Sequence, residues 1–179
     1  KRTDMSGLRL DYQLSSKTRV MLRGNIFRYH NPYELQSTQV GSHPAAVENF
    51  KRRSDELFAN MTRVMTNRIV NEVKVGFNSH LYQSSNYTYR PDHPQAANGI
   101  VYGHPRITFR GFAVGGNVRT PQNNSANVYQ LRDDLTISFD KGGRHDMKLG
   151  AEDLYAINAA FSCRYCMGNI DAQNGPVPA

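Results

Sequence analysis

Three long stretches of this chain alternate polar and apolar side chains, and each contains a polar break near its middle. The stretches span about residues 7–29, 55–83 and 127–156. An alternation of period two predicts β-strands, because successive side chains of an extended chain point to opposite sides. Each break is short enough for a turn, so the pattern predicts three antiparallel hairpins and about six strands.

The third stretch shows the alternation most clearly. One side carries Tyr129, Leu131, Leu135, Ile137 and Phe139, with Asp133 as the exception, and the other carries Gln130, Arg132, Asp134, Thr136 and Ser138. The sequence DKGG at residues 140–143 then predicts a turn, because glycine readily adopts a positive φ. After the turn, Met147, Leu149, Ala151 and Tyr155 alternate with Lys148, Gly150 and Glu152.

Short turns and long connections follow one another along the chain. The long connections span about residues 31–53, 84–126 and 159–179. Bacterial outer-membrane barrels have short periplasmic turns and long outer loops. Their strands need about 9–11 residues to cross the bilayer, whereas soluble strands average about 5–6. The runs here have about 8–15 residues. We therefore predict an all-β, antiparallel transmembrane β-barrel segment of three long hairpins with long outer loops.

Composition excludes some other classes. The 179 residues include 22 Lys and Arg against 15 Asp and Glu, for a formal net charge of +7. These basic residues are scattered singly, except for the group Lys51-Arg52-Arg53, which makes only a weak patch, so we expect no nucleic-acid partner. No window approaches the roughly 18 consecutive apolar residues of a membrane helix. The first residues lack a secretory signal, and we expect the chain to be part of a longer protein.

The charged side of the predicted strands is expected to face a wet lumen, and the apolar side is expected to face lipid. Opposite charges on neighbouring strands would pair and help to set the register. Lining a channel or contacting a plug is the alternative role for these side chains. The expected lumen-facing residues are Arg9, Asp11, Arg19, Arg23, Glu72, Lys74, Arg132, Asp134, Lys148 and Glu152.

The connection at residues 99–116 is rich in glycine and aromatic residues and has an alternation of its own. It predicts a small hairpin within the long loop, above the membrane. A loop that packs on itself is one interpretation, and a ligand-binding loop is the other. The candidate ligand contacts are Tyr102, Arg106, Phe109, Arg110 and Phe112.

The sequence holds little that points to catalysis or metal binding. Cys163 and Cys166 are the two cysteines, and a structural zinc site needs four ligands. We expect a local disulfide between them, which would fit an oxidising compartment. The six histidines show no H-E-x-x-H motif. We therefore predict no enzymatic activity, no metal site and no cofactor.

Two segments resemble the barrel region of TonB-dependent outer-membrane receptors. The first, at residues 131–150, reads LRDDLTISFDKGGRHDMKLG. It is most similar to the Oar-like group, whose members often carry a carboxypeptidase-regulatory-like domain ahead of the plug. The matching elements are Asp133-Asp134-Leu135-Thr136, Gly143-Arg144-His145 and Met147-Lys148-Leu149-Gly150. The second segment, IVNEVKVGFN at residues 69–78, is similar to another strand of that group.

The resemblance implies a location in the outer membrane of a Gram-negative bacterium. It also implies several partners: outer-membrane lipid, the remainder of the barrel, a plug domain, TonB acting through that plug, and an unidentified solute. The chain departs from the pattern in its number of strands. Such receptors have about 22 strands, whereas the alternation here predicts about six. No plug domain and no TonB box are recognisable in it.

The aromatic residues fit a membrane barrel only in part. The chain has ten Tyr and no Trp, although membrane proteins usually carry both at the interfaces. Tyr129 and Tyr155 have the lipid-facing parity, whereas Tyr29 and Tyr82 have it only if a bulge intervenes. Two alternatives stay open: a soluble, secreted β-sandwich that binds glycan or protein, and a passive porin or adhesin barrel.

Overall fold

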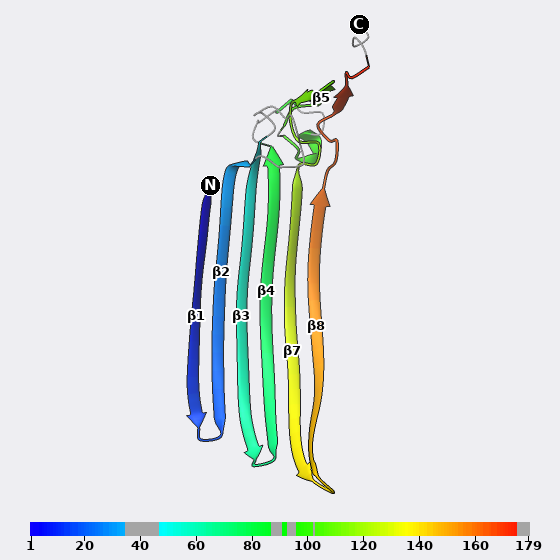
Figure 1. Cartoon of the computed structure of the whole chain (residues 1–179). Coiled ribbons are helices and arrows are strands. Elements are labelled where there is room, and N and C mark those ends of the chain that lie inside the picture. Colours follow the sequence, from blue (N-terminus) through cyan, green and yellow to red (C-terminus); the bar gives the residue numbers. More distant parts are fainter. Residues whose placement is uncertain (35–46, 87–90, 93–95, 102, 175–179) are drawn as a thin grey trace.

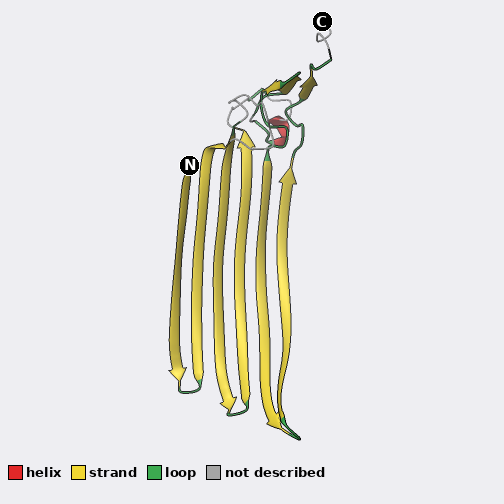
Figure 2. Cartoon of the chain, viewed as in Figure 1, coloured by secondary structure: helices red, strands yellow, loops and turns green. Residues whose placement is uncertain are grey.

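The computed structural model describes residues 1–34, 47–86, 91–92, 96–101 and 103–174. It is built from one large antiparallel sheet, with a small sheet above one end (Figure 1). Strands dominate the cartoon, and the short 3-10 turn η2, Ala96–Asn98, is drawn as a helix (Figure 2). Within the described part of the chain, no helix has the length and apolarity needed to cross a membrane. The predicted all-β, antiparallel fold is confirmed.

The large sheet has six strands in the order β1-β2-β3-β4-β7-β8. Their bounds are β1 Arg2–Ser15, β2 Thr18–Glu34, β3 Glu48–Thr66, β4 Ile69–Asn86, β7 Gln122–Asp140 and β8 Arg144–Ser162. The small sheet has the order β6-β5-β9, with β5 Arg106–Phe109, β6 Phe112–Val114 and β9 Asn169–Asp171. Among the described residues the large sheet is open, and its edges are β1 and β8.

The six strands are longer than the alternation predicted. The ends of the predicted outer loops, such as residues 31–34 and 48–53, belong to β2 and β3. Charged residues interrupt the apolar pattern there, but ladder hydrogen bonds depend on the backbone and continue through them. A strand of 19 residues, such as β3, spans about 60 Å at roughly 3.3 Å per residue. It therefore extends well beyond a hydrocarbon core of about 30 Å.

All three tight turns lie at one end of the sheet, and the small sheet lies at the other (Figure 1). The turns contain residues 16–17, 67–68 and 141–143. In the third turn, Gly142 and Gly143 have φ values of 68° and 139°. A side chain is disfavoured at these angles, which is why the turn needs glycine.

Successive turns are staggered, and the stagger measures the tilt of the strands. Thr18, at the start of β2, pairs with Arg63, and β3 continues three residues beyond Arg63. Likewise, Ile69 at the start of β4 pairs with Ile137, and β7 continues three residues further. Each step is about 10 Å along the strands for about 10 Å of sheet width. If all turns lie in one membrane plane, the strands tilt by about 45°, as in membrane barrels.

The register separates the strands into an apolar face and a charged face. One row of the apolar face runs Leu10, Leu22, Ala59, Val75 and Leu131 across five neighbouring strands. Ala59 is half-buried and the other four side chains are exposed; Leu10 and Leu131 are 55% and 53% accessible. Within the described residues, no other element packs across this face. A broad apolar surface without a covering layer suits contact with lipid.

Bulges do not move the two doubtful tyrosines to the apolar face. Register shifts occur between Gln13 and Ser15, between Asn31 and Glu34, and between Val64 and Thr66. None of them separates Tyr29 or Tyr82 from the neighbouring charged row. The structure therefore supports Tyr129 and Tyr155, but not Tyr29 and Tyr82, as aromatic residues of the apolar face.

Candidate functional site

The residues predicted to face the lumen all share one side of the large sheet, which we call the charged face. Arg9 pairs with Arg23 across β1 and β2, and Lys74 pairs with Arg132 across β4 and β7. Arg132 in turn pairs with Glu152 on β8. Directly paired residues project to the same side. Following the pairs across the sheet also places Asp11, Arg19, Glu72, Asp134 and Lys148 there.

Asp134 is the centre of an ion-pair network on the charged face. Arg132 donates from Nε and Nη2 to the two carboxylate oxygens of Asp134, at 3.0 Å each. Lys74 Nζ lies 3.0 Å from Asp134 Oδ2 and also 3.2 Å from Glu72 Oε2. Lys148 Nζ approaches the same Asp134 oxygen at 3.8 Å. Three cations therefore compensate a carboxylate whose side chain is only 2% exposed.

Gly150 makes room for this carboxylate. It pairs directly with Asp134 across β7 and β8. A Cβ atom at position 150 would lie 2.4 Å from Asp134 Oδ1 and 3.2 Å from the Asp133 carbonyl oxygen. The absence of a side chain at Gly150 therefore lets the Asp134 carboxylate lie flat against the neighbouring strand.

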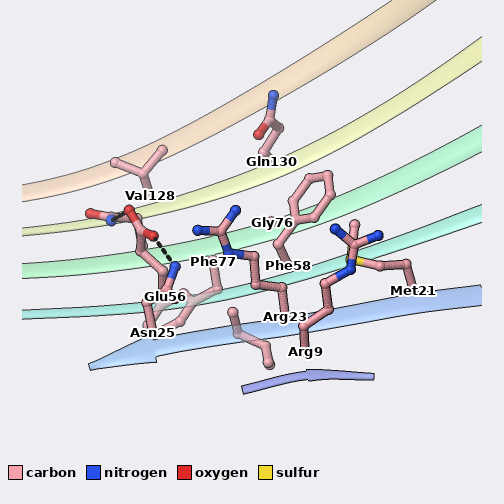
Figure 3. Close-up of a pocket in the computed structure, with 12 residues that line it drawn as sticks. Arg9, Met21, Arg23, Asn25, Glu56, Phe58, Gly76, Phe77, Val128 and Gln130 are labelled. Carbon is pink, nitrogen blue, oxygen red and sulfur yellow. Dashed lines mark hydrogen bonds between the residues drawn. The ribbon is translucent and has the colours of Figure 1, made fainter. Parts of the chain in front are cut away.

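The β1–β2 end of the charged face has an excess of arginine. Asp11 accepts from Arg9 Nε at 2.7 Å and from Arg19 Nη2 at 2.8 Å. Arg23 has neither a hydrogen bond nor an ion pair with another described residue. It borders a hollow of about 360 Å³ that Arg9, Glu56 and Gln130 also line (Figure 3). This part of the charged face presents positive charge to whatever lies in front of it.

An aromatic cluster lies at the outer end of the same face. The Phe50 ring contacts Tyr29 and Tyr82 edge-to-face, with centroids 5.7 Å and 5.0 Å away. The Arg52 guanidinium lies 4.9 Å from the centre of Phe50 and 5.5 Å from that of Tyr82. Cation–π and edge-to-face contacts of this kind hold the strand ends together. They explain why Tyr29 and Tyr82 have the parity of the charged face.

Above this cluster, the connections fold into a compact unit that we call the outer cap, residues 96–101, 103–121 and 163–174. Glu48, which is fully buried, accepts hydrogen bonds from Ser84 Oγ and Asn117 Nδ2. Asn86 donates to Thr120 Oγ1 and to Met167 Sδ. Glu48 and Asn86 are paired residues of the charged face. Buried polar groups that satisfy one another in this way fix the cap over the outer end of that face.

The predicted ligand-contact residues are in or beside the small sheet of the cap. β5 and β6 form the expected hairpin, and Phe109 stacks on Phe112 with 4.8 Å between ring centroids. Arg106 is half-buried at the start of β5, and Arg110 is exposed in the turn. Phe112 is 52% exposed. Tyr102 lies outside the described residues. The ligand-binding role of these residues stays a prediction.

The post-β8 segment contains a disulfide between Cys163 and Cys166. The Cys163 amide donates to the Pro121 carbonyl, and the Tyr165 amide donates to the Val118 carbonyl. The disulfide loop is thereby attached to the chain that enters β7. Within the described residues, no group of three or more His, Cys, Asp and Glu side chains is arranged to hold a metal ion.

Sequence reasoning missed the residues that fasten the cap. Glu48 and Asn117 are far apart in the chain, and neither belongs to a recognisable motif. The pair Gly115-Gly116 offered a local hint, because Gly115 has φ 92° and lies against the Pro105 backbone. The Asp134 network was partly foreseen, since opposite charges at similar strand positions predicted cross-strand pairs.

Comparison with known proteins agrees with this architecture. The family described as an outer membrane β-barrel domain matches residues 1–175. No curated protein and no solved structure is significantly similar to the chain. The family match spans all six strands of the large sheet and the cap, and it locates the chain in the outer membrane of Gram-negative bacteria. The chain forms a staggered sheet with an uncovered apolar face and tight turns at one end, as expected of a membrane β-barrel wall. It therefore belongs to the outer membrane β-barrel domain family.

Proposed function

We propose that the chain forms part of the barrel wall of a TonB-dependent receptor. Such a receptor binds a scarce solute outside the cell and takes it up with energy that TonB delivers to a plug domain. The observation that carries the proposal is the position of the two receptor-like segments. Residues 69–78 lie in β4, and residues 131–150 span β7, its turn and β8. These are three neighbouring strands of the sheet.

The two segments also share the main ion-pair network. Glu72 and Lys74 come from the first segment, and Arg132 and Asp134 come from the second. We assign the charged face to the lumen, because charge on the lipid side would be costly. In a plugged barrel, paired wall charges present fixed donors and acceptors to the plug. Arg23, which lacks a partner among described residues, is the wall residue best suited to meet a plug carboxylate.

The outer cap is the proposed solute-contacting region. It stands at the end with long connections, which faces the outside in bacterial outer-membrane barrels. Tyr102, Arg106, Phe109, Arg110 and Phe112 remain the proposed contacts. The stacked rings of Phe109 and Phe112 offer an exposed apolar surface beside Arg110. The partners proposed for the whole protein are outer-membrane lipid, the plug, TonB and the solute.

The test uses the intact protein that contains this chain, purified from outer membranes. We expect it to co-purify with the periplasmic domain of TonB and to show no steady conductance in planar bilayers, because a plug closes the lumen. A passive porin would give discrete conductance steps and no TonB binding. An adhesin would give neither TonB binding nor conductance. Either of these two results would overturn the proposal.

A further inference from the structure

A basic cluster lies on the side of the sheet that carries the apolar face, just beyond the outermost apolar side chains. Two rows of paired residues make it: Asp4, Arg28 and Arg53, followed by Arg2, His30 and Lys51. These residues have the same parity as Leu10, Leu22 and Ala59. Their side chains therefore leave the barrel wall on the side that contacts the membrane.

The height of the cluster matches the headgroup layer of the outer leaflet. Leu22 lies near the middle of the apolar part of β2, and Arg28 is six residues further out. At about 3.3 Å per residue and a tilt of about 45°, Arg28 is roughly 14 Å above the membrane centre. His30, eight residues beyond Leu22, is roughly 19 Å above it, and Lys51, its partner on the next tilted strand, is roughly 22 Å above it. The hydrocarbon ends at about 15 Å and the headgroups end at about 20–22 Å.

The cluster has more positive charge than its own carboxylates compensate. Asp55 pairs with Arg28 at 2.5 Å and with Arg53 at 3.6 Å, and Asp4 pairs with Arg2 at 2.6 Å. Lys51 has no ion pair with a described residue. Four permanent cations thus face two carboxylates, and His30 stands among them. The side chains border a hollow of about 300 Å³ that Leu81 also lines.

We propose that this basic cluster binds the phosphate groups of a phosphorylated lipid headgroup in the outer leaflet. Arg and Lys are the side chains that hold phosphate, through charge-assisted hydrogen bonds. The cluster continues directly from the apolar rows, so acyl chains lying on Leu10 and Leu22 would carry their headgroup to this height. Membrane-facing basic residues attract anionic lipid in general. The site is independent of the TonB proposal, because it needs only a wall that spans the outer membrane.

The experiment measures lipid retention on the intact barrel. Purified protein in detergent is exposed to bis-phosphorylated lipid A or to lipid A from which both phosphates have been removed, with divalent cations chelated. Native mass spectrometry then counts the lipids that stay bound. The test variant is the double substitution Lys51→Gln and Arg53→Gln. The matched control is Arg63→Gln, which removes an arginine of the same parity from the turn end of β3, away from the outer leaflet.

We expect the phosphorylated lipid to bind about tenfold more tightly than the dephosphorylated lipid. The double variant should lose that preference, and Arg63→Gln should keep it. Equal binding of the two lipids to the native protein would overturn the proposal, even if the double variant fails to assemble. Displacement of the lipid by inorganic phosphate alone would also overturn it, because the site would then recognise a free anion.

Discussion

At the scale of single residues, the pairing of Gly150 with Asp134 is the most demanding contact of the wall. Asp134 is held by Arg132 and Lys74 and has almost no accessible surface. Its carboxylate lies between these two cations and the backbone of Gly150. A methyl group at position 150 would overlap Asp134 Oδ1, so either the ion pairs or the β7–β8 ladder must give way.

The substitution Gly150→Ala should therefore lower the free energy of unfolding of the intact barrel by about 1–3 kcal/mol. Urea unfolding in lipid vesicles, followed by heat-modifiable migration on gels, measures this loss. Gly24→Ala is the matched control, because its added Cβ would meet only the Glu56 carbonyl oxygen at 3.8 Å. A similar loss in both variants would show that the cost comes from the backbone and not from the Asp134 network.

At the scale of one strand, neighbouring residues of β2 lie on opposite faces and therefore differ in whether they contact lipid or the charged face. Leu22 belongs to an apolar row with Leu10 and Ala59. Met21, the preceding residue, belongs to the charged face and pairs with Asp11 and Asn60. A charge added at position 21 should therefore cost little stability, whereas the same charge at position 22 should destabilise the barrel. Both native residues are apolar.

Leu22→Arg should destabilise the intact barrel by about 2–4 kcal/mol, because it moves a guanidinium into mid-bilayer lipid. Met21→Arg should cost much less, since Asp11 and water stand on that side. Equilibrium unfolding of the two variants in the same vesicles supplies the comparison. Equal costs at the two positions would contradict the assignment of the apolar face to lipid.

At the scale of the whole molecule, the described strands form a staggered, open sheet and not a closed barrel. β1 and β8 are open edges whose backbone groups need partners, because lipid offers none. In a lipid bilayer, further strands must therefore pair with both edges of the sheet. The stagger of about three residues per hairpin should persist around the barrel, because closure requires a consistent shear.

The intact barrel should accordingly show a mean strand tilt of about 45° from the membrane normal. Polarised infrared spectroscopy of oriented bilayers measures this angle from the amide I dichroism. Upright strands, with a tilt below about 20°, would contradict the register described for β2–β3 and β4–β7.

The alternation of side chains made the faces predictable. Leu131, Arg132, Asp134 and Leu135 fall on the sides that the pattern assigned to them, because side-chain direction in a strand is set locally by a period of two. The tight turn at residues 141–143 was predictable for a similar local reason, because its glycines adopt the positive φ values that the turn needs. Strand length was underestimated because backbone pairing continues past Arg28 and Lys51, where the apolar signal stops.

The sequence by itself therefore determined which side chains share a face and where the chain reverses. Only the tertiary structure decided that Asp134 is buried under three cations, that Gly150 makes room for it, and that Glu48 and Asn117 fasten the cap. The physical reason is range: periodicity acts between neighbours in the chain, whereas register and burial depend on which distant strands meet. The local pattern does not specify the partners of Asp134 or Glu48, whereas the pairing of the strands in the sheet does.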